Sequence, residues 1–297
     1  MAGVLAMPGP RVRSADRPQR ALLPDGRRLH LQHGPIDLVI EAFGAPAEVA
    51  RAYDQAAACF DDVLATLVRE LPALRRPIAA PCPMLKGPVA RRMVAAVWPH
   101  RAAFVTPMAA VAGAVADEVL AALVAGRDLA RAYVNDGGDI ALYLTPGESF
   151  AAGVVADPRM PAIDGIAAIT ADMAVRGLAT SGQGGRSFSL GIADAVTVLA
   201  RDAAAADAAA TLIANAVNLD HPAVERAPAR DLDPDSDLGE LPVTVAVGAL
   251  EPAAVDAALD AGAGAAAAMR RAGLIEAAVL LLRGRWRVVG EPLREGA

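Results

Sequence analysis

Residues 194–218 read DAVTVLARDAAAADAAATLIANAVN, an apolar run followed by an alanine-rich one. Residues 195–199 (AVTVL) have the composition of a mostly buried strand. From Asp202 onward, the alanines and a few larger aliphatic residues have the propensity of a helix. The stretch therefore predicts a strand that leads directly into a helix, and the rest of the chain is interpreted around this unit.

Two polar residues interrupt the predicted helix. Asp207 and Thr211 are four residues apart, so they lie one turn above the other on one helical face. In apolar surroundings a lone carboxylate costs several kcal/mol, by roughly the usual desolvation scale, unless a partner compensates it. Carboxylate and hydroxyl oxygens suit Mg²⁺, which leaves its other positions to water and phosphate. The alternative is that Asp207 faces solvent and Thr211 bonds to a carbonyl of its own helix.

Composition limits the class of protein. The 297 residues are 55% hydrophobic but only 3% aromatic, which favours helices packed closely on a sheet through Ala, Val and Leu. The net charge is −6 and no dense run of Lys and Arg occurs, which argues against nucleic-acid binding. Cys59 and Cys82 have no metal-ligand spacing, which indicates a reduced compartment without structural zinc. We expect a cytoplasmic protein.

The chain is expected to form one domain. Residues 1–20 are rich in Pro and Arg and are predicted to be a disordered segment, whereas 21–297 form a single α+β domain. Residues 102–126 are weakly charged, but Pro107, Asp117 and Glu118 interrupt them. No membrane-spanning segment is therefore predicted.

Hydrophobic periodicity predicts most of the elements. Helices are expected over 46–74, 107–126 and 252–272, whereas 89–97 fits either a helix or a strand. Residues 228–241 are acidic and Pro-rich, and are predicted to be an exposed linker. Strands are expected over 27–32, 36–43, 131–135, 140–145, 163–170, 241–247, 275–282 and 286–289.

Glycines mark three further features. Asp136–Gly137–Gly138–Asp139 is either a hairpin turn or a loop whose N–H groups cradle phosphate. Residues 177–186 are dense in glycines and hydroxyls, which is typical of an anion-binding loop. Gly113, among alanines, gives a helix face without large side chains, suited equally to helix packing or to a flat ligand.

Three segments in order resemble the ApbE-like superfamily, whose best-known members are FAD:protein FMN transferases. The segments are N-x-G-G-D-I (135–140), A-T-S-G (179–182), and V-T-V-x-A with A-D-A-x-A-T (196–200 and 206–211). The similarity covers about residues 100–217. It looks closest to a short uncharacterised branch, in which a P-M-A-A-V-A-G-A helix (107–114) replaces the transferase A-K-G motif.

The resemblance implies an α+β, T-fold-like architecture of antiparallel sheets flanked by helices, with a flavin nucleotide near their junction. Asp207 would be catalytic and would hold Mg²⁺ together with Thr211. Aromatic residues available for the flavin ring are few: Phe104, Tyr133, Tyr143 and Phe188. The cofactor-binding residues implied are Asn135, Gly137, Gly138, Asp139, Thr180, Ser181 and Gly182.

The function implied is Mg²⁺-dependent binding of FAD or a related pyrophosphate-linked cofactor, with transfer of FMN to a Thr or Ser of an acceptor protein. The chain differs from the transferases in two places: Ala112 replaces a lysine, and the H-I-x-D-P-x-T-G segment is missing. One alternative is a non-transferase protein that handles a cofactor of sulfur or one-carbon metabolism in the same cleft. Another is a homo-oligomeric scaffold without a ligand.

Overall fold

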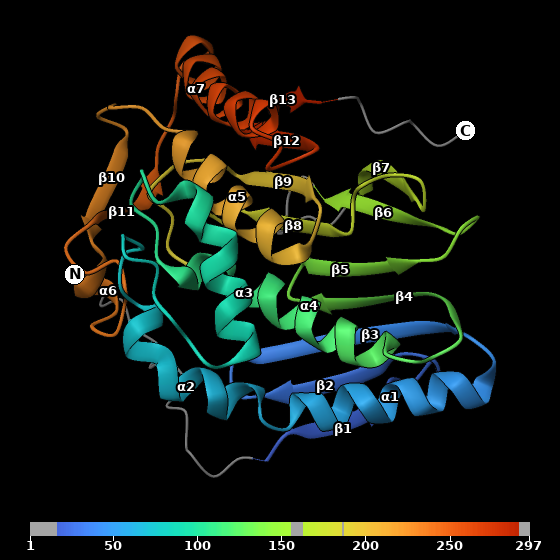
Figure 1. The fold of residues 1–297 in the computed structure, drawn as a ribbon. Helices are drawn as coiled ribbons and strands as arrows, with labels where there is room; N and C mark the ends of the chain where they lie inside the picture. The colour runs from blue at the N-terminus through green and yellow to red at the C-terminus, as the bar shows by residue number, and fades with distance from the viewer. Residues whose placement is uncertain (1–16, 156–162, 186, 291–297) are drawn as a thin grey trace.

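A single large sheet dominates the computed structural model, which describes residues 17–155, 163–185 and 187–290. Nine strands follow the order β1-β2-β3-β4-β5-β8-β9-β12-β13, and all neighbours are antiparallel (Figure 1). The architecture is therefore α+β with antiparallel sheets, as predicted. The strands are β1 (Gln19–Leu22), β2 (Leu29–His33), β3 (Ile36–Gly44), β4 (Leu129–Asp136), β5 (Asp139–Leu144), β8 (Gly177–Ser181), β9 (Ala195–Ala200), β12 (Ala277–Leu282) and β13 (Arg285–Val289).

Helices cover one face of this sheet, with α4 and α5 over its middle (Figure 1). Alanines fill much of both helices, so their backbones approach the strands closely. The helices are α1 (Pro46–Phe60), α2 (Val63–Leu74), α3 (Pro88–Val97), η1 (Trp98–His100), η2 (Pro107–Ala110), α4 (Val111–Val124), α5 (Ala203–Ala216), α6 (Ala229–Leu232) and α7 (Pro252–Arg271).

The contact between α4 and α5 requires a glycine. A Cβ atom added to Gly113 would lie 2.2 Å from the carbonyl oxygen of Ala203, which no packed structure tolerates. One turn further along α4, the buried carboxylate of Asp117 accepts the N–H groups of Ala203 at 3.0 Å and Ala204 at 2.9 Å. Helix packing therefore explains the small residues around Gly113, the first of the two interpretations above.

The opposite face of the sheet has its own apolar cluster. Alternation along β4 puts Ala132 in the core under the helices and Tyr133 on the other side. The hairpin of β6 (Ser149–Val155) and β7 (Ile163–Thr170) contributes the fully buried Ile169, which belongs to the same cluster as Leu142 and Leu178. A third sheet pairs β10 (Val224–Pro228) with β11 (Pro242–Val247).

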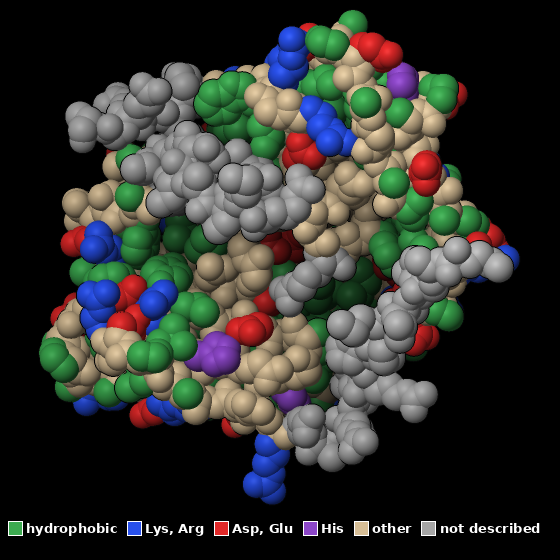
Figure 2. All heavy atoms as spheres, turned by 180° about the vertical axis from the view of Figure 1, so that it is seen from behind, with side chains coloured by type: hydrophobic (Ala, Val, Ile, Leu, Met, Phe, Trp, Pro, Cys, Tyr) green, Lys and Arg blue, Asp and Glu red, His purple; other side chains and the backbone are tan. Residues whose placement is uncertain are grey.

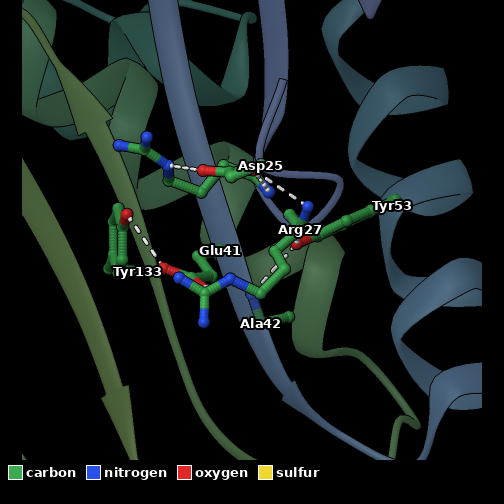
Figure 3. Close-up of polar contacts among 7 residues, drawn as sticks. Asp25, Arg27, Glu41, Ala42, Tyr53 and Tyr133 are labelled. Carbon is green, nitrogen blue, oxygen red and sulfur yellow. Dashed lines mark hydrogen bonds and ion pairs between the residues drawn. The ribbon is translucent and has the colours of Figure 1, made fainter. Parts of the chain in front are cut away.

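Polar contacts around a buried glutamate tie the β1–β2 turn, β3, β4 and α1 together (Figure 3). Glu41 is 9% exposed, and it accepts a hydrogen bond from the hydroxyl of Tyr133 at 3.3 Å. Its other oxygen is 3.7 Å from the guanidinium of Arg27. The hydroxyl of Tyr53 donates to the carbonyl of Arg27 at 2.6 Å and accepts the N–H of Ala42 at 3.3 Å. These contacts satisfy a buried charge without any part in the cavity described below.

Two predicted helices differ from expectation. The helix predicted over 46–74 is two helices, α1 and α2, separated at Asp61 and Asp62. Adjacent aspartates are poor helix formers, and Asp62 has φ −103° and ψ −4°, outside regular helix geometry. The ambiguous 89–97 segment is helix α3. Phe60 and Val63 lie on either side of the break and are both buried. The apolar spacing of the sequence therefore continues across the break and predicts a single helix.

The turn between β12 and β13 is a tight hairpin. Arg283 and Gly284 have φ 51° and 74°, and they close the predicted hairpin of β12 and β13. Residues 1–16 of the segment predicted to be disordered lie outside the described residues, whereas Gln19 and Arg20 form part of strand β1.

One helical run is long enough to cross a membrane by length and composition. It covers Pro107–Val124, has a mean hydropathy of 1.7, and stands alone in this respect among the described residues. Within the protein, 56% of it is buried, and it lies at the centre of the helical layer. Packing in the core accounts for its apolar character.

Candidate functional site

A cavity of about 700 Å³ opens beside the start of α4. Six segments far apart in the sequence line it: the end of α2, the chain leading into η2 and α4, the β4–β5 turn, the loop after β8, one face of α5, and the loop after α6. The view from behind shows the surface hollowed near the middle of this face, with acidic and apolar side chains inside the hollow (Figure 2). Most of the site residues predicted from the sequence lie along this cavity.

One face of α5 supplies the polar side of the cavity. Asp207 and Thr211 both line it, as their four-residue spacing predicts. Asn215, one turn further on, lines it too and accepts the N–H of Leu190 on its side-chain oxygen at 2.9 Å. Asn215 was not predicted from the sequence, although it continues the same four-residue spacing.

The surroundings of Asp207 disfavour an ionised carboxylate. Burial raises the pKa of its carboxyl well above the ordinary value, and the nearby carboxylates of Asp139 and Asp136 raise that pKa further. The N–H of Gly113 donates to Oδ2 of Asp207 at 3.1 Å and opposes this rise, but not enough to cancel it. A cation beside Asp207 would stabilise its ionised form.

The donors present fit Mg²⁺. A carboxylate and a hydroxyl, one helical turn apart at a cavity wall, are hard oxygen ligands. Within the described part of the chain, no group of three or more His, Cys, Asp or Glu side chains is arranged to hold a metal ion. A few protein oxygens with water and phosphate in the other positions match Mg²⁺ rather than the closed ligand sets of structural zinc.

The β4–β5 turn is a hairpin, and only part of it faces the cavity. Gly137 and Asp139 line the cavity, whereas Asn135 and Gly138 are not among the lining residues. The N–H of Gly138 donates to the side-chain oxygen of Asn135 at 2.8 Å, so this N–H is not available to a phosphate. The N–H of Thr180 donates to Asp139 at 3.3 Å, which joins this turn to the end of β8.

The end of β8 brings hydroxyls to the cavity. Thr180, Ser181 and Gly182 all line it. The hydroxyls of Thr180 and Thr197 are 2.9 Å apart, which fixes the Thr180 side chain across the β8–β9 pair. A Cβ atom on Gly182 would lie 2.5 Å from the carbonyl oxygen of Asp194, so close approach of the chain requires this glycine.

The acidic segment 228–241 is exposed over residues 230–235, as predicted, but it is more than a linker. It forms the end of β10, the short helix α6 and a loop in which Asp233, Asp235 and Asp237 line the cavity. The hydroxyl of Thr106, a residue only 3% exposed, donates to Oδ2 of Asp237. Thr106 and Asp237 are 131 residues apart in the sequence, and their hydrogen bond holds the acidic loop in place. A contact between such distant residues cannot be predicted from local sequence patterns.

Two of the four candidate aromatic residues reach the cavity. Phe104 and Phe188 line it, and both are partly exposed, at 40% and 37%. Tyr133 instead bonds Glu41, and Tyr143 packs against the core under the helices. The cavity therefore offers an apolar edge at its rim and a polar wall inside.

An antiparallel α+β fold with the three motif segments brought around one cavity defines an ApbE-like protein. The sequence model of a family described as AbpE bacteria matches residues 20–288, and the chain belongs to this family.

Curated relatives match part of the chain. A UPF0280 protein of Methanothrix thermoacetophila is 42% identical over 118 residues, which cover 39% of this chain and 48% of the relative. Another, from Methanothermobacter thermautotrophicus, is 37% identical over 147 residues, which cover 46% of this chain and 52% of the relative. The chain spans about half the length of the curated relatives it matches.

Two solved structures resemble the whole chain at low identity. The flavin transferase ApbE of Vibrio cholerae has 10% identity and a TM-score of 0.44, over 93% of this chain and 98% of that one. The ApbE protein of Thermotoga maritima has 12% identity and a TM-score of 0.45, over 94% of this chain and 99% of that one.

Proposed function

We propose that the chain is a Mg²⁺-dependent cytoplasmic protein that binds FAD or a similar pyrophosphate-linked cofactor in this cavity. The observation that carries the proposal is the position of Asp207 and Thr211, stacked on one face of α5 at the cavity wall. Burial and two neighbouring carboxylates disfavour the charge of Asp207, so a ligand that brings a cation is favoured there. The name of the Vibrio cholerae protein, a flavin transferase, supports flavin as the ligand.

The residues of the cavity have separate roles in this proposal. Asp207 and Thr211 would hold Mg²⁺, which neutralises phosphate charge when bound. The hydroxyls of Thr180 and Ser181 face the same space and can donate to phosphate oxygens. Phe104 and Phe188 give the flavin ring an apolar surface at the rim.

The reaction we propose is transfer of FMN from FAD to an acceptor protein. A Thr or Ser hydroxyl of the acceptor forms a bond to the phosphorus on the FMN side, the pyrophosphate bond breaks, AMP leaves, and the hydroxyl proton passes to solvent. Such a displacement depends on positioning and charge neutralisation more than on covalent help. Ala112, where the transferases have a lysine, supplies no charge to this step.

Calorimetry with FAD tests the binding role. The native protein is expected to bind FAD in the presence of MgCl₂ and to lose affinity at least tenfold when EDTA replaces the magnesium. Asp207→Ala is expected to remove the effect of magnesium, because it deletes the carboxylate ligand, and Asp220→Ala on the exposed surface serves as the control. The proposal fails if native protein shows no FAD binding, or if Asp207→Ala keeps the full magnesium effect.

A second function is favoured by the residues the chain lacks. Residues 183–193 contain no histidine, and position 112 is alanine, so the cavity suits a protein that holds a cofactor without transferring it. In that case FAD or another phosphorylated cofactor binds, but neither AMP nor FMN-labelled acceptor appears. Mass spectrometry of the small molecule that copurifies, together with an AMP-release assay, separates the two functions.

A further inference from the structure

We infer that Arg75 binds the phosphate groups of the cavity's ligand and so determines its preference for phosphorylated molecules. The inference rests on the proposed function and adds a residue to it. Arg75 lies at the C-terminal end of α2, far in sequence from the motif segments, and this exposed residue lines the cavity. It is the one basic residue among the described residues that do so.

The guanidinium of Arg75 is available to a ligand. It forms no ion pair or hydrogen bond with any residue that the structure describes, in contrast to most of the described arginines. Arg92, for example, pairs with Glu118 at 2.7 Å, and Arg287 pairs with Asp260 at 2.8 Å. An arginine left unpaired at a cavity wall is a binding group whose hydrogen bonds are still to be made.

The backbone that carries Arg75 is fixed. The preceding residue, Leu74, is fully buried, and Ile78 follows with 5% exposure. The N–H of Ile78 donates to the carbonyl of Val105 at 2.8 Å, which attaches this segment to the chain that enters η2. Arg75 therefore extends its side chain from a rigid part of the cavity wall, next to the residues that hold the acidic loop.

Charge explains why an arginine is needed. The other ionisable side chains along the cavity are carboxylates, so a phosphate entering it meets a repulsive field. A cation at Asp207 and Thr211 relieves this on one side, and Arg75 supplies the remaining positive charge. Its planar fork can bind two phosphate oxygens at once, which a lysine cannot do. The carboxylates belong to Asp136, Asp139, Asp194, Asp207, Asp233, Asp235 and Asp237.

The test compares two adjacent arginines. Arg75 and Arg76 are both exposed, but only Arg75 lines the cavity, so Arg76→Ala is a matched control for Arg75→Ala. Affinities for FAD in excess MgCl₂ and for riboflavin, which has no phosphate, are measured by calorimetry on the full chain. Arg75→Ala is expected to weaken FAD binding by about ten- to a hundredfold, the usual worth of a charge-assisted hydrogen bond, and to leave riboflavin binding unchanged. Arg75→Lys should lie between native and Ala.

Each outcome decides between the inference and the function on which it rests. If native protein does not bind FAD, the proposed function fails and the inference fails with it. If native protein binds FAD, Asp207→Ala weakens it and Arg75→Ala matches Arg76→Ala within about twofold, only the inference is overturned. Arg75→Ala could also weaken FAD and riboflavin binding equally, or lower Tm where Arg76→Ala does not. Either result would mean that Arg75 supports the fold, and would overturn the inference that Arg75 binds phosphate.

Discussion

At the scale of single residues, the half-buried Asp207 and the buried Asp117, on neighbouring helices, have different tasks. Asp207 faces a cavity, and backbone N–H groups at the start of α4, among them that of Gly113 at 3.1 Å, donate to its carboxylate without cancelling the rise in its pKa. Asp117 faces the start of α5 and accepts two N–H groups that the helix itself cannot satisfy. The first residue is suited to bind a ligand, and the second is suited to hold a helix end in place.

Asp117 makes stability depend on pH. Burial raises its pKa to about 6 from the ordinary 3.8, so the folded state binds this proton more tightly than the unfolded chain does. The resulting stabilisation is complete below about pH 4 and is lost as pH rises to about 6, a change of about 3 kcal/mol in the free energy of unfolding. Asp117→Asn is expected to remove this part of the pH dependence, although it also removes one of the two hydrogen bonds, because an amide nitrogen cannot accept an N–H.

Urea unfolding at several pH values between 4 and 7 measures the effect. The exposed Asp220→Asn serves as the control and should keep the native slope. A slope for Asp117→Asn equal to that of the native protein would contradict the assignment.

At the scale of elements, the α4–α5 junction joins the core to the cavity. Gly113 lets α4 touch the first turn of α5, and its N–H also reaches Asp207. The same helix pair therefore provides close packing and one wall of the site. This is why a small residue is required at a position where most helices carry a side chain.

Gly113→Ala should be strongly destabilising. The new methyl group would lie 2.2 Å from the carbonyl oxygen of Ala203, so the helices must separate, at a cost of about 3 kcal/mol in the free energy of unfolding. Gly264→Ala in α7 is the control, since nothing lies within 4 Å of the added atom. That change should stabilise the protein by about 0.5–1 kcal/mol through helix propensity. Thermal unfolding of both variants gives the comparison, and equal Tm values would refute it.

Element-scale prediction succeeded where the signal is local. Strand β9 and helix α5 follow from the composition of residues 194–218, and the β12–β13 hairpin follows from Arg283 and Gly284. The break between α1 and α2 was missed because the buried Phe60 and Val63 keep the apolar spacing across it. The sequence could place Asp207 and Thr211 side by side because both belong to one helix, whereas Arg75 and the acidic loop reach the cavity only through tertiary contacts.

At the scale of the whole molecule, the cavity depends on contacts between distant segments. The loop after α6 lies against it, and the hydroxyl of the buried Thr106 donates to Asp237. Thr106 also precedes η2, which continues into α4. One hydrogen bond therefore connects the acidic loop to the start of the central helices.

Removing that hydrogen bond should free the acidic loop. Thr106→Val keeps the side-chain shape but deletes the donor, which should cost about 1 kcal/mol in the free energy of unfolding and accelerate hydrogen exchange in residues 233–239. Thr66→Val on α2, away from the cavity, is the control. Exchange by mass spectrometry on the full chain checks the result, and unchanged exchange in 233–239 would show that other contacts hold the loop.

The shared junction of α4 and α5 has a consequence for engineering. Any library that fills the alanine- and glycine-lined seam with larger groups to withstand heat will also shift the helix that presents Asp207. Selection for thermal endurance and selection for tighter ligand retention would then compete for the same few positions. Improvements that leave ligand retention intact should instead come from the outer surface, for example along α7.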